Sequence, residues 1–181
     1  IIHQYGTASY LFLFVIIFME TGLVVTPFLP GDSLLFAAGS ISSTGEFNLL
    51  LVMIVCIIAA FVGDTVNYWI GRSVGPKIFE SNNPFFKKAY LEKAQSFYKK
   101  HGGFAIILSR FVPIVRTFAP CVAGISKMSY PTFLLYNIIG GTLWVLLFTS
   151  LGFFFGNIPL VKSHFELVMV AIVLVSVVPL V

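Results

Sequence analysis

Charged side chains are scarce in this sequence of 181 residues, since only 10% are charged and 58% are hydrophobic. Soluble domains are about 25% charged and roughly 45–50% apolar. A chain of this size cannot enclose so much apolar surface in one water-soluble core. The composition therefore excludes an ordinary soluble domain and indicates an integral membrane protein. Twenty Phe and seven Tyr residues suit lipid-facing and interfacial positions.

Clustered cysteines and catalytic motifs are also lacking. Cys56 and Cys121 lie alone in apolar stretches, so they indicate neither a disulfide framework nor a metal site. His3, His101 and His164 are scattered, and the sequence contains no nucleotide-binding loop, zinc signature or nucleophile elbow. These absences predict a protein that is not an enzyme and that holds no metal and no cofactor.

The net charge of +4 is not spread along the chain. Residues 72–101 hold seven Lys or Arg against two Glu, beside apolar spans. Anionic lipid and the positive-inside rule explain this segment better than a nucleic-acid partner does, so we expect a cytoplasmic linker. Within it, residues 85–100 place aromatic and basic residues on opposite faces of a helix. This pattern predicts a basic amphipathic helix on the inner membrane surface; the alternative is a solvated helix that docks on the protein.

The first apolar segment, residues 10–41, is interrupted. Pro27, Pro30 and Gly31 break any helix, and the apolar piece that follows, 33–41, is far shorter than the roughly 20 residues that span a bilayer. A long piece, a break and a short piece predict a re-entrant helical hairpin. Irregular backbone at membrane depth survives only where protein or a water-filled cavity covers it.

Two full-length spans are predicted at 47–71 and 130–155. Residues 156–162 form an outer loop, and residues 165–181 begin a C-terminal transmembrane helix. The chain begins without the basic region and cleavage site of a signal peptide. It ends inside an apolar run, so we expect further residues at both ends.

A second broken segment, residues 104–126, contains Arg110, Pro113 and Arg116. The order is hairpin, span, linker, hairpin, span, with the two hairpins on opposite sides of the membrane. Glu20 and Arg110 are 90 residues apart, as are the prolines at 30 and 120. Interrupted apolar segments in two corresponding halves predict an inverted-repeat transporter whose site lies at the breaks.

Four ionisable groups fall in the broken segments: Glu20, Asp32, Arg110 and Arg116. Each costs about 2.5–3.5 kcal/mol at the centre of a lipid-exposed helix, so we expect the two acids and the two bases to compensate one another. The break at Pro113 lets both guanidiniums turn toward one cavity, where two Arg forks suit a phosphate. The alternative is that both Arg extend to the headgroups and only set topology.

Glu20 and Asp32 are candidates for coupling to protons or another cation, because carboxylates in a dry site take up protons more readily than in water. Alternatively, each acid only neutralises an Arg. Polar residues near the breaks and along the first span are candidates to line the same cavity; they are Asp64, Asn67, Tyr68, Arg72, Pro30, Gly31, Pro113 and Thr117. For Asp64 a structural hydrogen bond remains an equal alternative. A weaker stripe, formed by Asn137, Gly141 and Trp144, follows the second span.

Three motifs follow one another along the chain. The first combines ETG at 20–22 with FLPGD at 28–32. The second is GDTVNYWIGR at 63–72, and the third is SRFVPIVRT at 109–117, continuing to Ala123 and Gly124. Together they resemble the signatures of the bacterial DedA family of inner-membrane proteins, part of the SNARE-associated/VTT group. The resemblance implies an all-α membrane fold with two facing re-entrant hairpins. It also implies that Glu20, Asp32, Arg110 and Arg116 are functional.

The resemblance further implies a lipid-carrier role in the bacterial cytoplasmic membrane. We expect transport of a polyprenyl (undecaprenyl) phosphate or similar anionic lipid, coupled to H⁺ or Na⁺. The expected partners are membrane lipids, with a homo-oligomer left open. The alternatives are a phospholipid flippase or scramblase, a proton-coupled small-molecule transporter that supports membrane energetics, and a non-transporting scaffold. A membrane enzyme acting on lipid phosphates is weaker still, because no nucleophile and base are paired.

Overall fold

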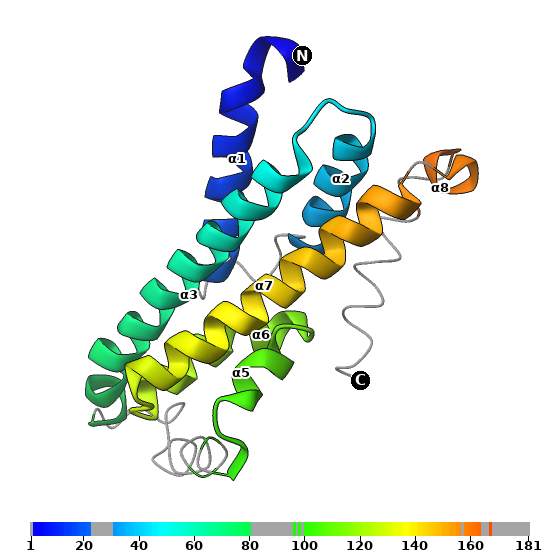
Figure 1. Cartoon of the computed structure of the whole chain (residues 1–181). Coiled ribbons are helices and arrows are strands. Elements are labelled where there is room, and N and C mark those ends of the chain that lie inside the picture. Colours follow the sequence, from blue (N-terminus) through cyan, green and yellow to red (C-terminus); the bar gives the residue numbers. More distant parts are fainter. Residues whose placement is uncertain are drawn as a thin grey trace.

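The structure, a computed structural model, describes residues 2–22, 31–80, 96, 98, 100–156, 158–163 and 167. Every regular element in these ranges that has defined bounds is an α-helix (Figure 1). In chain order they are α1 (Ile2–Gly22), α2 (Gly31–Ser43), α3 (Leu49–Glu80), α5 (Phe104–Ser109), α6 (Pro113–Ile125), α7 (Tyr130–Phe155) and α8 (Pro159–Ser163). The described part of the chain is therefore all-helical, as the sequence predicts.

Within the described residues, two helices are long and apolar enough to cross a membrane, at Leu49–Ser73 in α3 and Tyr130–Phe155 in α7. Only about a third of the most apolar window of each is buried inside the protein. The outward faces carry large apolar side chains that are more than half exposed, among them Leu50, Leu135 and Phe154. Exposed apolar surface on this scale is costly in water and suits lipid.

The other helices are shorter, and local sequence explains where α6 begins. α2 has 13 residues and so extends about 20 Å, which is less than the hydrocarbon core of a bilayer. α6 starts at Pro113, and the preceding Val112 is extended (φ −121°, ψ 104°) because a proline disfavours helical backbone in the residue before it. Pro113 then fits the first helical position, where its missing N–H costs nothing.

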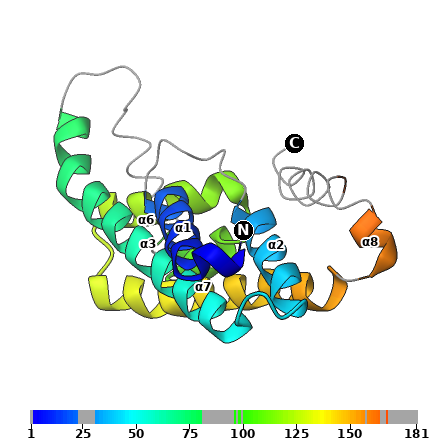
Figure 2. The ribbon, with the colours of Figure 1, turned by 90° about the horizontal axis from the view of Figure 1, so that it is seen from above.

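The helices pack in a repeated scheme. α1 and α6 pack on α3, whereas α2 and α5 pack on α7, and α3 crosses α7 (Figure 1). In Figure 1 α1 runs away from the end of the molecule that holds the N-terminus, and α2 runs back toward that end. α8 follows the end of α7, away from α1 and α3 (Figure 2).

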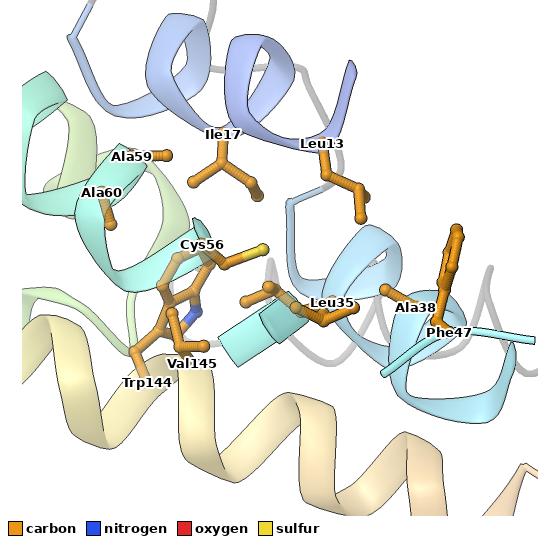
Figure 3. Packing of buried hydrophobic residues seen from close by; sticks show 11 residues of the cluster. Leu13, Ile17, Leu35, Ala38, Phe47, Cys56, Ala59, Ala60, Trp144 and Val145 are labelled. Carbon is orange, nitrogen blue, oxygen red and sulfur yellow. The ribbon is translucent and has the colours of Figure 1, made fainter. Parts of the chain in front are cut away.

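Two apolar clusters fill the interior. One joins α1, α2, α3 and α7 and is centred on Ile17, Leu35, Cys56 and Trp144 (Figure 3). The other joins α3, α5, α6 and α7; its buried members are Tyr68, Tyr98, Ala105, Ile106, Ala123 and Phe133. The two clusters lie toward opposite ends of α3 and α7, and the polar site lies between them.

Glycines allow the helix backbones to touch. A Cβ atom at Gly39 of α2 would overlap the carbonyl oxygen of Thr149 on α7. Likewise, a Cβ atom at Gly124 of α6 would overlap the carbonyl oxygen of Tyr68 on α3. Small residues at crossings are the usual means of tight packing in membranes, where lipid gives no hydrophobic drive between helices.

Some predicted segments differ from the structure or lie outside it. α3 continues to Glu80, beyond the predicted span end at 71, and α8 replaces part of the outer loop predicted at 156–162. The predicted last span, 165–181, lies outside the described residues except for Leu167. The amphipathic helix predicted at 85–100 also lies outside them, apart from residues 96, 98 and 100.

Candidate functional site

Arg116 lies at the centre of the first polar layer. It projects from the first turns of α6 and is only 3% exposed. Its Nη1 donates a hydrogen bond of 2.7 Å to Oδ1 of Asp32, and its Nη2 forms an ion pair with Oε1 of Glu20. One guanidinium thus joins the end of α1 and the start of α2 to α6. We refer to Glu20, Asp32, Arg116 and Trp144 as the Arg116 layer.

The two carboxylates of this layer lie at helix ends. Glu20 is in the last turn of α1, and its Oε1 also accepts a hydrogen bond of 3.2 Å from the backbone N–H of Gly31. Asp32 lies in the first turn of α2, where the helix dipole favours negative charge. A Cβ at position 31 would overlap the Glu20 carboxylate, so only glycine leaves room for it.

Trp144 of α7 completes the Arg116 layer and is fully buried. Its indole Nε1 donates a hydrogen bond of 2.7 Å to the same Asp32 oxygen that accepts from Arg116. The guanidinium carbon of Arg116 lies 4.6 Å from the centre of the Trp144 ring, within cation–π range. α7 therefore contacts both the acid and the base of this ion pair.

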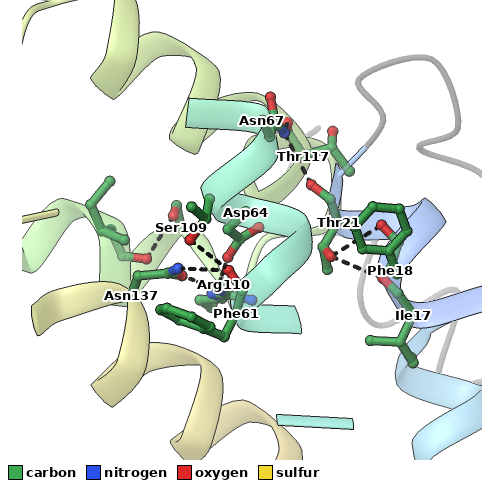
Figure 4. Close-up of polar contacts among 12 residues, drawn as sticks. Ile17, Phe18, Thr21, Phe61, Asp64, Asn67, Ser109, Arg110, Thr117 and Asn137 are labelled. Carbon is green, nitrogen blue, oxygen red and sulfur yellow. Dashed lines mark hydrogen bonds and ion pairs between the residues drawn. The ribbon is translucent and has the colours of Figure 1, made fainter. Parts of the chain in front are cut away.

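Arg110 belongs to a second polar layer, which we call the Arg110 layer, with Asp64 and Asn137 (Figure 4). Arg110 caps the C-terminal end of α5 and is 2% exposed. Its Nη2 forms an ion pair with Asp64 of α3 and donates a hydrogen bond to Oδ1 of Asn137 on α7. Gly141 on α7 lies beside the guanidinium, and a Cβ atom there would make only an ordinary contact, 3.5 Å from Nη2.

A buried amide joins the helices beside these layers. Nδ2 of Asn67 on α3 donates to the carbonyl oxygens of Thr21 on α1 (3.0 Å) and Thr117 on α6 (2.7 Å) (Figure 4). Both acceptors immediately follow a charged residue of the Arg116 layer. Asn67 therefore holds the backbones that position Glu20 and Arg116.

The pairing differs in part from the sequence prediction. We expected the two acids of the first broken segment to neutralise the two bases of the second. Arg116 does pair with Glu20 and Asp32, but Arg110 pairs with Asp64 of the first span. The two guanidiniums consequently lie in separate ion pairs, because α5 packs on α7 beside α3 while α6 reaches across to α1 and α2.

The other predicted cavity residues have different surroundings. The hydroxyl of buried Tyr68 donates to the carbonyl oxygen of Met128 (2.5 Å), which anchors the loop before α7. Arg72 is exposed and donates to that hydroxyl and to the same carbonyl, so it lies outside the two polar layers. Its position at the end of the apolar span lets it reach solvent. Thr117 contributes its backbone carbonyl, as described above.

Of the two predicted prolines, only Pro113 belongs to the described residues, and Pro30 lies outside them. Pro113 acts through backbone geometry, since it starts α6 three residues before Arg116. The sequence indicates that the stripe with Asn137 and Trp144 faces the cavity or the other half, but it assigns neither residue a role. Their contacts with Arg110 and Asp32 depend on the packing of α7 against α5 and α2, which no local pattern predicts.

A cavity of about 610 Å³ lies beside α5 and α6. It is lined mostly by apolar side chains: Tyr98, His101, Phe104, Ala105, Leu108, Ser109, Val112, Val115, Phe118, Ala119 and Val122. Its lining includes Ser109, the residue before Arg110, and Val115, the residue before Arg116. A hydrophobic space of this kind suits a hydrocarbon chain rather than an ion.

The buried charges do not balance. Within the described residues the buried ionisable side chains of the two layers comprise three carboxylates and two guanidiniums. One negative charge remains uncompensated when all five are ionised. Among the same residues, no group of three His, Cys, Asp or Glu side chains is arranged to hold a metal ion.

Comparisons with known proteins identify relatives across most of the chain. Residues 29–154 match the model of the VTT domain. The chain is 55% identical to Protein DedA of Escherichia coli strain K12, over 99% of this chain and 83% of that protein. It is 43% identical to uncharacterized membrane protein ML0287 of Mycobacterium leprae (91% and 74% covered) and 35% identical to inner membrane protein YqjA of E. coli K12 (95% and 79% covered). No solved structure matches the chain significantly.

Proposed function

The chain belongs to the VTT-domain family of membrane proteins, the DedA family, and from that premise we propose that it moves an anionic lipid across the bacterial cytoplasmic membrane. The substrate class is a polyprenyl phosphate such as undecaprenyl phosphate, or a lipid with a similar headgroup. Transport is coupled to protons or sodium. Only the headgroup crosses the protein, while the hydrocarbon chain stays in lipid or in the apolar cavity beside α5 and α6.

The observation that carries this proposal is the buried Arg116, held between two carboxylates at the ends of α1 and α2. A buried charge in a membrane protein is costly and usually functional. Arg presents a planar fork that matches phosphate oxygens, and those oxygens can replace carboxylate oxygens as hydrogen-bond acceptors. A lipid phosphate therefore competes with Glu20 and Asp32 for the same guanidinium.

The excess negative charge supports coupling to a cation. Protonation of Glu20 or Asp32 weakens one of the two ion pairs of Arg116 and frees a donor for phosphate. The same proton removes the imbalance among Glu20, Asp32, Asp64, Arg110 and Arg116. Substrate binding and proton uptake then favour one another. Bound Na⁺ near the carboxylates neutralises the charge in the same way.

We also propose that α1–α2 and α5–α6 are re-entrant hairpins of an inverted repeat. Helix packing supports this: Gly39 and Gly124, which occupy corresponding places on α2 and α6, are 85 residues apart. Their contacts on α7 and α3, Thr149 and Tyr68, are 81 residues apart. Both spacings are shorter than the 90 residues between Glu20 and Arg110. The offset between the two halves therefore varies along the chain, because the connections between helices differ in length.

The orientation of the protein in the inner membrane follows from its basic linker, 72–101, which we place in the cytoplasm. Cysteines introduced at the exposed positions Thr44 and Ser96, with Cys56 and Cys121 replaced by serine, test this. A membrane-impermeant maleimide added to sealed cells should label position 44 and not position 96. Labelling with the opposite pattern would reverse the orientation.

A flipping assay in vesicles tests the function. Purified protein is reconstituted with a fluorescent polyprenyl phosphate, and movement between leaflets is measured by quenching from outside. The wild type should accelerate movement of the polyprenyl phosphate and leave the matching polyprenyl alcohol unaffected. Acceleration of both lipids, or of neither, would contradict the proposal.

Lys substitutions separate the phosphate fork from simple charge. Arg116→Lys keeps the charge but loses the bidentate geometry, so it should slow flipping at least about tenfold while the protein still inserts. Arg110 pairs with Asp64 outside this layer, so Arg110→Lys, which keeps that ion pair, should slow flipping less. Arg72→Lys is the matched control, since Arg72 is exposed at the end of the span, and it should flip at the wild-type rate. Full activity in Arg116→Lys would end the phosphate hypothesis.

A further inference from the structure

We propose that Trp144 is a phosphate-binding residue: its indole N–H and the Arg116 guanidinium together form a site for one phosphate oxygen, and Asp32 occupies that site in this structure. The inference deepens the proposed function and rests on it for the identity of the lipid. The ligand chemistry is a phosphate monoester.

The geometry is that of an anion site that already holds an internal anion. Two donors, Nη1 of Arg116 and Nε1 of Trp144, converge on one Asp32 oxygen, both at 2.7 Å. These lengths are typical of short, charge-assisted hydrogen bonds to an anionic oxygen. A phosphate oxygen accepts hydrogen bonds at similar lengths, so it can take the place of Oδ1 without a new arrangement of the donors.

The donors are held in place independently of Asp32. Trp144 is fully buried in the apolar cluster with Val145 and Cys56, so its indole cannot turn away. The Arg116 guanidinium lies against the face of this ring, 4.6 Å from its centre. When Asp32 withdraws, the stacking contact keeps the guanidinium beside α7. Preorganised donors of this kind reduce the ordering cost of binding.

The indole also adds selectivity. Its N–H donates and cannot accept, so it favours an anionic or carbonyl oxygen and gives nothing to a cation. A buried indole N–H also needs an acceptor for purely structural reasons, and Asp32 supplies one. A structural role predicts that Trp144 remains bonded to Asp32 whether or not substrate is present. A binding role predicts that its partner changes, which alters the environment of the indole.

Tryptophan fluorescence reads this change directly, because the chain has two tryptophans. Trp69 is 47% exposed on α3 and outside both polar layers, so Trp69→Phe leaves Trp144 as the reporter. The purified variant is titrated with a short-chain polyprenyl monophosphate, the matching alcohol and inorganic phosphate. Trp144 emission should change saturably with the monophosphate and not with the alcohol. A response to inorganic phosphate alone would keep the site but assign it to free phosphate.

A conservative variant supplies the second measurement. Trp144→Phe keeps an aromatic ring against Arg116 but loses the N–H donor and part of the ring volume, so the Kd for the monophosphate should rise about tenfold. Trp69→Phe is the control and should keep the wild-type Kd. An unchanged Kd in Trp144→Phe, or an emission that no phosphate compound alters, would overturn the inference. If Trp144→Phe does not fold, the emission of the Trp69→Phe protein still tests whether Trp144 responds to phosphate binding.

The outcomes for the two proposals are separate. Wild-type flipping of polyprenyl phosphate with an unaffected Trp144→Phe variant refutes only the role of Trp144. Binding that depends on Trp144, in a protein that flips no lipid, refutes the transport function and supports the binding site.

Discussion

The Arg116 layer and the Arg110 layer use the same kind of ion pair for different purposes. Trp144 and Asn137, which represent the two layers on α7, are seven residues or about 10 Å apart. Arg110 has one carboxylate partner, Asp64, and is electrically neutral with it. Arg116 has two carboxylate partners and carries the excess negative charge.

The elements that supply the partners differ as well. The Arg110 layer joins the two long helices α3 and α7 to the end of α5. The Arg116 layer joins the C-terminal end of α1 to the N-terminal ends of α2 and α6. A balanced pair, with one carboxylate for one guanidinium, between long helices indicates a structural link. An overcharged pair, with two carboxylates for one guanidinium, at helix ends indicates that the guanidinium exchanges partners.

The largest effect is expected from breaking the balanced pair. Asp64→Asn leaves the Arg110 charge buried without a counter-charge, and removing one partner of a buried ion pair costs about 3–5 kcal/mol. The free energy of unfolding in detergent should fall by this order. The double variant Asp64→Asn with Arg110→Gln is the control and should recover much of the loss. Equal stability of Asp64→Asn and wild type would mean that this layer is not a structural link.

A medium effect is expected from crowding each layer with one methyl group. In Gly31→Ala the new Cβ would overlap the Glu20 carboxylate, so Glu20 must turn away from Arg116. In Gly141→Ala the Cβ would lie 3.5 Å from Nη2 of Arg110, an ordinary contact. The displaced Glu20 can no longer pair with Arg116 again after the phosphate leaves, so Gly31→Ala should slow flipping about tenfold.

Gly141→Ala is the matched control for this prediction and should flip within about twofold of wild type. The same flipping assay measures both. Similar rates for the two alanine variants would show that Glu20 is not needed in its present position, and the distinction between the layers would be lost.

The smallest effect on stability is expected in the overcharged layer. Asp32→Asn removes the excess negative charge, keeps an oxygen acceptor for Trp144 and leaves Glu20 paired with Arg116. Unfolding free energy should change by less than about 1.5 kcal/mol, since a hydrogen bond of typical strength is at stake.

The pH dependence should nevertheless change in Asp32→Asn. In the wild type, falling pH neutralises a carboxylate and releases Arg116, so flipping should accelerate as pH falls. In the variant one carboxylate is already neutral, and the rate should vary less with pH. Flipping rates between about pH 6 and 8 measure this. A profile as steep as that of the wild type would assign proton coupling to another group.

The sequence alone identifies the solvent of this protein and the position at which α6 begins. Scarce charge and long apolar runs require a lipid environment. Pro113 favours the start of a helix for local steric reasons that do not depend on the tertiary fold. The four charged residues at the breaks were also evident, because a charge inside an apolar run is costly and therefore conspicuous. These are local properties, and no knowledge of the fold is needed to read them.

The partners of those charges were decided by the tertiary structure. Arg116 pairs with residues 84 and 96 positions away, and Arg110 takes Asp64 rather than an acid of the first broken segment. Such pairs depend on which helices approach closely, and glycines such as Gly39 and Gly124 set that approach by leaving room for a facing backbone. The sequence reveals each glycine, but it does not reveal which backbone packs against that glycine. Only the packed helices bring Trp144 to Asp32, and so separate an overcharged layer from a balanced one.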